Sequence, residues 1–347
     1  MTTMLDVAKK AGVSKATVSR VLAGNSYVSK TTRDRVFKAI EESGYRPNLL
    51  ARNLATRKSQ SIGLVVTNTL YHGPYFSELL FQTATLTEQH GRQLIMADGK
   101  HSAEEERQAI QFLLDLRCDA IIIYPRFLSP AELEKIIEQH PQPIMVVNRQ
   151  LSRYPDHCVF AAHQQDCQEA VSHLIAQGHR QIAFIRGVVG SPTSESRYAG
   201  YQQALAAHNI EFEAARVTEG DWTSESGRLA AEQLLARGVD FSALVASNDD
   251  MAIGAARAFH QVGIAIPQQI SLLSFDDIPI ASYFIPTLTT VHVPVAEMIK
   301  ETLNRLVNLL DGKQNAPQTP FRGKLILRES VIPLAERAQA SKSPAGR

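Results

Sequence analysis

The first 25 residues place apolar side chains at helical spacing, in two short runs separated by a glycine. The apolar positions of the first run are Leu5, Val7, Ala8 and Ala11, and those of the second are Val18, Val21 and Leu22. Gly12 supplies the turn between the runs, because glycine adopts a positive φ without steric cost. Thr3, with Asp6 three residues later, and Ser14 are placed to cap the two helices. The pattern predicts a pair of helices around a tight turn.

The second of these helices presents small and basic residues to solvent. Its outward positions are Lys15, Ala16, Ser19 and Arg20. A thin basic helix face fits the major groove of DNA. A generic helical hairpin would show the same division of faces, so the pattern alone leaves both interpretations open.

A third helix is predicted over residues 30–43. Its Val36, Phe37 and Ile40 would close a small three-helix core, and Gly44 stands where a helix usually ends. A head of about 45 residues is near the lower size limit for independent folding.

The stretch that follows, residues 45–60, reads YRPNLLARNLATRKSQ. Leu50, Ala51 and Leu54 share one side of about two helical turns. A helix this short is unstable alone in water. The stretch therefore fits either a flexible basic linker or a hinge that folds only on a partner.

From residue 62 onward, short β-rich runs alternate with amphipathic helical stretches. The predicted strands are IGLVV, QLIMA, AIIIYP, PIMVVN, QIAFIRG, SALVAS and ISLLSF, and examples of the helices are residues 102–116, 166–177, 224–237 and 249–262. This alternation predicts a doubly wound, largely parallel α/β body, arranged as two similar lobes joined by several chain crossings. The predicted domains are a head (1–46), a hinge and linker (47–60), the body (61–337) and a small, polar, disordered tail (338–347).

Charge is distributed unevenly along the chain. Residues 1–60 hold twelve Lys and Arg against four Asp and Glu, a net charge of +8, whereas the whole chain carries +1. A small basic head on a mildly acidic body indicates that the head binds nucleic acid.

The start of the chain lacks the apolar region of a signal peptide, and no apolar run has the length of a membrane span. Cys118, Cys158 and Cys167 are odd in number and lack CxxC spacing, which fits unpaired thiols in a reducing cytoplasm. We therefore expect a cytoplasmic protein without a membrane partner.

No metal site, cofactor or catalytic arrangement is predicted. His163, Cys167, His173 and His179 match no standard spacing of metal ligands. The paired acids at 249–250 and 276–277 lie where strands lead into helices, so Asp249 and Asp277 are interpreted as helix caps. The sequence contains no GxSxG, P-loop or HExxH pattern.

Several segments together resemble the LacI/GalR family of bacterial repressors. They are GVSKATVSRVLAGN, YRPNLLARNLA and IGLVV near the start, and SRYAGY, EGDW, LVASNDDMAIGA and SFDD in the body. They occur in the family order over nearly the whole chain. The resemblance implies a helix-turn-helix head, a hinge helix and a body like that of the periplasmic binding proteins. It also implies a homodimer that binds a palindromic DNA operator as a repressor.

The resemblance assigns DNA-binding roles to residues of the head and hinge. Lys15, Ala16 and Arg20 would face base edges, with arginine suited to guanine, and phosphates would be held by Ser14, Thr17, Ser19 and Asn25. In the hinge, Leu54 would wedge into a base step at the operator centre, with Ala51 one turn earlier.

The resemblance also implies a small sugar effector in the cleft between the lobes. The matching positions are Phe76, Asn148, Arg197, Trp222, Asn248 and Asp276, with Tyr75 beside Phe76 at the cleft mouth. An arginine and a carboxylate read neighbouring sugar hydroxyls by donating and accepting hydrogen bonds, and the tryptophan would stack on a pyranose face. The segments YHGPYF, HSAEEERQAI and LLDLRCDAI most resemble the repressor of a β-glucoside operon, which implies a β-glucoside effector.

The resemblance places the dimer interface in the first lobe, at the helix near Tyr75 and around Leu94–Ile110. The leucine-heptad tail of the tetrameric branch is absent after Ile332, which favours a dimer over a tetramer. Three other readings remain: a periplasmic-type sugar-binding protein without a DNA role, a purine-type co-repressed regulator, and a sugar-modifying enzyme. The basic head argues against the first and the missing acid/base pair against the last.

Overall fold

The computed structural model describes residues 2–22, 27–45, 59–68 and 73–336. The chain divides into two compact units, one formed by residues 1–60 with 117–119 and the other by residues 61–116 and 120–347. The predicted tail (338–347) and most of the predicted hinge (47–58) lie outside the described residues.

The first unit contains a three-helix bundle with a small apolar core. Its helices are α1 (Met4–Ala11), α2 (Lys15–Leu22) and α3 (Lys30–Ser43). The core is built on Val7, Val18, Val21 and Val36, which are all buried. Phe37, predicted to lie in this core, is instead half exposed, because Val36 and Ala39 form the inward side of α3.

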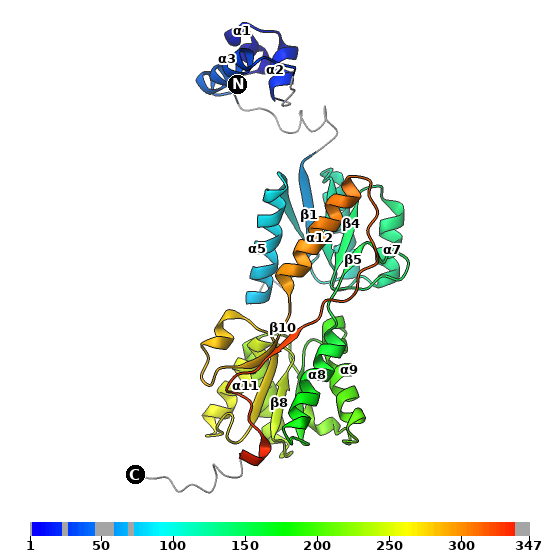
Figure 1. Ribbon diagram of the computed structural model, residues 1–347, viewed down its shortest axis with the longest axis vertical. Helices are drawn as coiled ribbons and strands as arrows, with labels where there is room; N and C mark the ends of the chain where they lie inside the picture. The colour runs from blue at the N-terminus through cyan, green and yellow to red at the C-terminus, as the bar shows by residue number, and fades with distance from the viewer. Residues whose placement is uncertain (1, 23–26, 46–58, 69–72, 337–347) are drawn as a thin grey trace, which may run out of the picture. The chain divides into compact units, whose positions relative to one another are not determined.

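The second unit consists of two α/β lobes (Figure 1). The sheet of the first lobe has the order β2-β1-β3-β4-β5, with every pairing parallel. The elements of this lobe are β1 (Ser61–Val66), α5 (Pro74–Gln89), β2 (Gln93–Asp98), α6 (Ala103–Asp115), β3 (Ala120–Tyr124), α7 (Pro130–Gln139), β4 (Ile144–Val147), β5 (Cys158–Val159) and the late helix α12 (Val295–Leu310).

The second lobe repeats the strand order of the first. Its sheet runs β11-β10-β9-β8-β6-β7 and is parallel except for the pairing of β10 with β11. Its elements are α8 (His163–Ala176), β6 (Ile182–Arg186), α9 (Pro192–Ala207), η2 (Ala214–Arg216), β7 (Val217–Glu219), α10 (Ser224–Ala236), β8 (Ala243–Ala246), α11 (Asp249–Gln261), β9 (Ser271–Asp276), η3 (Pro279–Ser282), β10 (Thr289–His292) and β11 (Lys324–Ile326).

The chain crosses between the lobes three times within the described residues. It passes from β5 to α8, returns from β10 to α12, and crosses again from α12 to β11, so that α12 packs in the first lobe against α5 and β4 (Figure 1). Two crossings lie side by side, because Ala161 forms an isolated parallel bridge with Phe321. The two lobes are thus linked by several crossing segments of the chain, as predicted.

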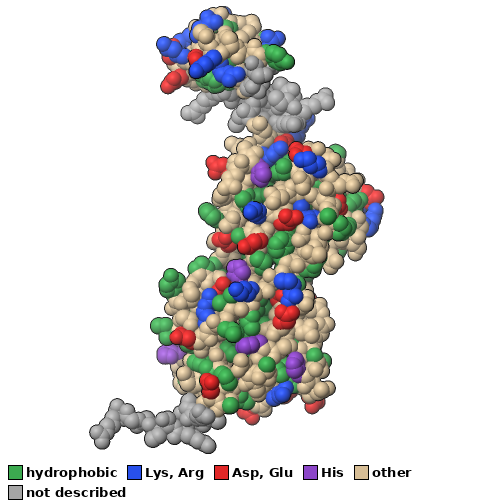
Figure 2. Space-filling view, viewed as in Figure 1, with side chains coloured by type: hydrophobic (Ala, Val, Ile, Leu, Met, Phe, Trp, Pro, Cys, Tyr) green, Lys and Arg blue, Asp and Glu red, His purple; other side chains and the backbone are tan. Residues whose placement is uncertain are grey.

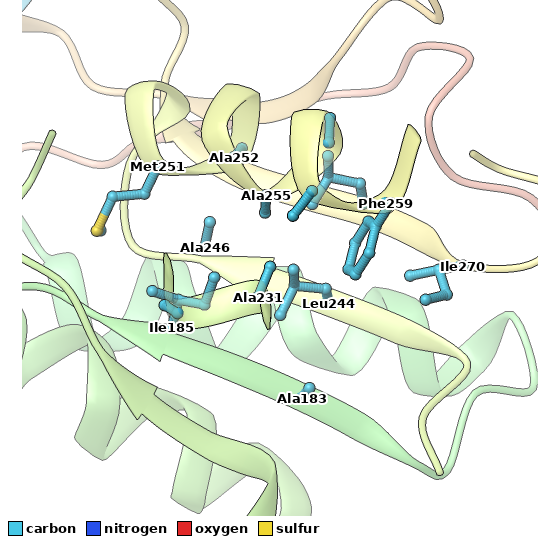
Figure 3. Packing of buried hydrophobic residues seen from close by; sticks show 14 of the residues in the cluster. Ala183, Ile185, Ala231, Leu244, Ala246, Met251, Ala252, Ala255, Phe259 and Ile270 are labelled. Atoms are coloured by element: carbon cyan, nitrogen blue, oxygen red, sulfur yellow. The ribbon is translucent and has the colours of Figure 1, made fainter. Parts of the chain in front are cut away.

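The core of the second lobe shows why its strands are apolar throughout. Ala252, Ala255 and Phe259 of α11 face Leu244 and its neighbours on the sheet, with Ala231 of α10 alongside (Figure 3). Because helices cover both faces of the parallel sheet, β6 and β8 read as continuous apolar runs instead of alternating ones. The carboxyl ends of these strands remain free to form a site.

Candidate functional site

The helices of the head are capped as the sequence predicts. The Thr3 hydroxyl accepts from the Asp6 amide, and the Asp6 carboxylate accepts from the Thr3 amide at 2.9 Å, which completes a capping box. Ser14 Oγ accepts from the Thr17 amide at 3.1 Å at the start of α2. Gly12 has a φ of +64°, the left-handed conformation that the turn requires.

The outer side of α2 is free for a partner. Ser14, Lys15, Ala16, Ser19 and Arg20 are exposed, while Thr17 is partly buried beside Ser14. Lys and Arg side chains are visible over the face of the head that Figure 2 shows. The remaining predicted contacts of the head and hinge (Asn25, Ala51 and Leu54) lie outside the described residues.

A cavity of about 540 Å³ lies between the two lobes. Its lining comes largely from loops that follow the carboxyl ends of strands: Tyr124 ends β3, Asn148 follows β4, Asn248 follows β8 and Asp276 ends β9. The lobes share the 2-1-3-4-5 strand order, in which ligands bind outside the carboxyl ends at the point where the order reverses. The cavity is therefore the candidate ligand site of the body.

A buried ion pair between Arg197 and Asp276 lines the cavity on the side of the second lobe. Arg197, only 2% exposed, donates from Nη2 to Asp276 Oδ1 at 3.0 Å and from Nη1 to the Ser247 carbonyl. Its guanidinium lies over the Phe275 ring, 4.5 Å from the centroid, and its Nε has no hydrogen-bond partner among the residues that the structure describes. Burial raises the pKa of Asp276, whereas the charge of Arg197 opposes that shift. A ligand hydroxyl beside this pair would meet both a donor and an acceptor.

Asn148 is the centre of a polar network that joins the lobes. Its Nδ2 donates to the Tyr124 hydroxyl at 2.8 Å and to Thr193 Oγ1 at 3.0 Å, and its Oδ1 lies 2.8 Å from His163 Nε2. Tyr124 and Asn148 belong to the first lobe, and Thr193 and His163 to the second. Burial lowers the pKa of His163 well below its usual value, so the ring is neutral and donates from Nε2 to the amide oxygen. The network depends on the relative position of the lobes.

Trp222 and Asn248 line the cavity from the second lobe, as do Arg197 and Asp276. Trp222 has a φ of +76° and its ring lies so close to Gly187 that a Cβ there would overlap it. Asn248 accepts from the Met251 amide at 3.0 Å as the N-cap of α11 and donates from Nδ2 to the Trp222 carbonyl at 2.9 Å. The cap of one helix thus fixes the loop that presents the only tryptophan.

Five of the six predicted ligand residues come together in the cavity, namely Asn148, Arg197, Trp222, Asn248 and Asp276. Phe76 is the exception: it was predicted to line the cavity and does not. Successive residues of a helix point about 100° apart, so Tyr75 faces the cavity while Phe76 packs against the apolar core of the first lobe.

The predicted capping roles of Asp249 and Asp277 are also wrong. Asn248, not Asp249, caps α11, and Asp249 is buried. Its carboxylate accepts from Ser274, from Thr290 at 2.7 Å and from the Ile278 amide at 2.8 Å. Asp277 forms an ion pair with Arg328 at 2.7 Å, and its Oδ2 lies 3.3 Å from His292 Nδ1.

The cavity contains further polar residues that were not predicted from the sequence as ligand residues. They are Tyr124, Arg126, Arg149, His163, Thr193, Asp221 and Asp250. Most of these residues directly follow a predicted strand or lie near the start of a helix. Their position at the carboxyl ends of the strands could therefore have indicated that they line the ligand site. No group of three or more potential metal ligands occurs among the described residues. In the same part of the chain, no helix is long and apolar enough to cross a membrane.

Comparison with known proteins decides the family. Residues 3–48 match the family described as bacterial regulatory proteins, lacI family, and residues 171–331 match the periplasmic binding protein-like domain. Over 332 residues the chain is 61% identical to the HTH-type transcriptional regulator AscG of Escherichia coli K12, covering 96% of this chain and 99% of that protein. The chain belongs to the lacI family.

Two solved structures are also similar to this chain. One is a sugar-binding transcriptional regulator of the LacI family from Escherichia coli complexed with phosphate, with a TM-score of 0.74 and 57% identity over 80% of this chain and 99% of that one. The other is the Lac repressor dimer bound to operator and an anti-inducer, with a TM-score of 0.86 and 29% identity over 95% and 99%. The predicted fold class is confirmed. As a lacI-family member, the chain is a transcriptional regulator with a DNA-binding helix-turn-helix head.

Proposed function

We propose that the protein is a dimeric repressor of a carbohydrate-utilisation operon, released from its operator by a sugar held in the interlobe cavity. The cavity is the observation that carries the proposal: it brings a buried Arg197–Asp276 pair, two amides and Trp222 around one space. Acceptors and donors beside an aromatic face are the groups that recognise sugar hydroxyls and a pyranose ring. No enzymatic activity is part of the proposal. Because its operator would be chromosomal, the protein would act in the cytoplasm.

The exposed face of α2 supports the DNA-binding part. Lys15 and Arg20 are exposed and form no ion pair with a carboxylate among the described residues, so both are available to DNA without first breaking an ion pair. An arginine bound to a guanine through O6 and N7 contributes about 1–3 kcal/mol of discrimination. We assign base readout to Lys15, Ala16 and Arg20, and operator wedging to Leu54.

A second copy of the chain would cover apolar side chains that the body leaves exposed. Phe81 on α5 and Met96 on β2 are 62% and 42% exposed in the first lobe, within the predicted interface. In the second lobe, Tyr283 and Ile285 are 79% and 91% exposed. Figure 2 shows hydrophobic side chains at the surface of both lobes. The Lac repressor of similar structure was solved as a dimer, which favours a second copy as the partner.

The proposal is tested by operator binding with the full chain. Genomic fragments selected by the protein would be titrated in gel shifts, with wild type, Arg20→Ala and the control Arg153→Ala, which removes an equal charge from an exposed site on the body. We expect Arg20→Ala to weaken specific binding about 10-fold or more and Arg153→Ala to leave it unchanged. Specific binding should also weaken steeply as salt increases.

The effector is tested with a calorimetric panel of β-glucosides, other sugars and purines. Binding of a β-glucoside that lowers operator affinity would support the proposal. Binding of a purine that raises operator affinity would replace it with co-repression, because a ligand shifts the equilibrium toward the state it binds better. A protein that bound sugars but no DNA fragment would contradict the repressor role.

A further inference from the structure

Two arginines of the first lobe line the cavity without a carboxylate partner. Arg126 follows β3 and Arg149 follows β4, and both side chains are only partly exposed. Neither forms an ion pair within 4.0 Å among the residues that the structure describes. Burial lowers the pKa of both guanidinium groups. A partly desolvated cation without a counter-charge is costly unless a ligand supplies one.

The nearby carboxylate of Glu106 accepts hydrogen bonds from backbone amides and does not pair with either arginine side chain. It is buried and accepts from the backbone amides of Arg126 at 2.6 Å, Phe127 at 3.0 Å and Leu128 at 2.8 Å. Glu106 therefore holds the loop that presents Arg126, while its charge reaches both arginines only at longer range.

The arginines themselves are positioned by few bonds. Arg126 Nη1 donates to the Gly190 carbonyl at 3.3 Å, and its guanidinium lies 5.3 Å from the Phe127 ring centroid. Arg149 Nη2 donates to the Pro125 carbonyl at 3.2 Å. Each guanidinium has five N–H groups in a planar fork, so most of these donors are left for a ligand.

The charges of the cavity are separated between its two walls. Arg126 and Arg149 lie on the first lobe, whereas Asp221 and Asp250 lie on the second. Arg197 and Asp276 pair with each other and cancel. A neutral sugar would satisfy the acidic wall through its hydroxyls and would leave the two arginines without a counter-ion.

We propose that the effector is a phosphorylated sugar whose phosphoryl group is bound by Arg126 and Arg149, while its hydroxyls face the Arg197–Asp276 pair and Asp250. The inference rests on the proposed sugar-controlled function and narrows its ligand. A phosphoryl group carries nearly two negative charges at neutral pH and three acceptor oxygens. It therefore matches two guanidinium forks better than a carboxylate does, since a carboxylate has one charge and two oxygens.

Calorimetry with the full chain in phosphate-free and sulfate-free buffer tests this assignment. The probes are methyl β-glucoside, its 6-phosphate, methyl β-glucuronide and inorganic phosphate. The variants are Arg126→Gln and Arg149→Gln, and Arg153→Gln is a charge-matched control on an exposed surface of the same lobe. Operator binding by each variant shows that it is folded.

We expect the 6-phosphate to bind at least 10-fold more tightly than the neutral glucoside. Either cavity variant should remove most of this preference, while Arg153→Gln behaves as wild type. Equal affinity for the two glucosides, a preference that survives both cavity variants, or tighter binding of the glucuronide would overturn the phosphoryl assignment.

The probes also separate this inference from the proposed function. If the neutral glucoside binds and phosphorylation adds nothing, the sugar effector stands and the phosphoryl site fails. If no sugar binds but inorganic phosphate binds in a way that needs both Arg126 and Arg149, the anion site stands and the sugar effector fails. If inorganic phosphate binds independently of both arginines and no sugar binds, both proposals are wrong.

Discussion

At the scale of single residues, Asp249 is the most unusual group near the cavity. It lies at the start of α11, is fully buried and accepts hydrogen bonds from two hydroxyls and a backbone amide. Burial, with a further contribution from the charge of Asp276, raises the pKa of its carboxyl from 3.8 to about 7. The side chain ties α11 to β9 and β10, next to the cavity-lining residues Asn248 and Asp276.

This pKa predicts a pH-dependent stability. Between about pH 4 and pH 7 the folded protein retains a proton on Asp249 that the unfolded chain releases. The stabilisation is therefore complete below pH 4 and is lost as the pH rises through about 7, with a slope of at most about 1.4 kcal/mol per pH unit. Urea unfolding of wild type and Asp249→Asn across this range should show a smaller decline in the variant.

The control for this experiment is Asp115→Asn, at the exposed end of α6. It should keep the wild-type slope. Identical slopes in wild type and Asp249→Asn would show that Asp249 does not titrate in this window.

Family motifs in the sequence located Arg197, Asp276 and Trp222, because each stands in a short segment that resembles a family motif. The partners of these residues were not predictable, since they come from distant parts of the chain. Arg197, for example, donates to the carbonyl of Ser247, 50 residues later. Both Tyr75 and Phe76 were expected at the cleft mouth, and Tyr75 lines the cavity whereas Phe76 does not, because one aromatic pair cannot fix the rotational phase of a helix.

At the scale of elements, the closest helix packing occurs between α10 and α11. A Cβ on Gly254 would overlap the carbonyl oxygen of Ser224, and one on Gly227 would overlap the backbone of Met251. Both helices begin at the cavity, where Trp222 and Asn248 precede them. The glycines therefore set the distance between the two helices that Trp222 and Asn248 precede.

We expect Gly254→Ala to destabilise the body by about 1–3 kcal/mol, because overpacking forces the two backbones apart. Urea unfolding followed by Trp222 fluorescence measures the loss. Arg257→Ala, on the exposed side of the same helix, should change stability by no more than about 0.5 kcal/mol. A Gly254→Ala protein as stable as wild type would mean that α11 shifts without cost.

The elements found by the hydrophobic pattern were those with long buried runs. The seven predicted strands correspond to β1, β2, β3, β4, β6, β8 and β9. The pattern missed β5, β7, β10 and β11, which have two to four residues each. Segments this short carry too few alternations for a period to be recognised, and their conformation is imposed by the neighbouring strand.

At the scale of the whole molecule, the body is built so that ligand and lobe arrangement affect each other. Asn148 of the first lobe bonds to Thr193 and His163 of the second, and Arg126 bonds to the Gly190 carbonyl across the same space. The side chains of Asn148, Thr193, His163 and Arg126 line the cavity. Gly190 lies outside the lining. A ligand that competes for these bonds has a different affinity for each arrangement of the lobes, which is the condition for control of a distant site.

Trp222 allows this control to be measured directly. It is the only tryptophan and lines the cavity, so its fluorescence should change when an effector binds, whether or not DNA is present. Linkage requires that an effector which weakens operator binding by a given factor is itself bound more weakly to the operator complex by the same factor. The effector affinities measured by Trp222 fluorescence with and without saturating operator should therefore differ by a certain factor. That factor is the one by which the effector changes operator affinity in gel shifts.

A duplex of unrelated sequence at the same concentration is the control and should leave the effector affinity nearly unchanged. Equal effector affinity with and without operator would show that the cavity and the head are not coupled, and the cavity would then serve a purpose other than release of the repressor.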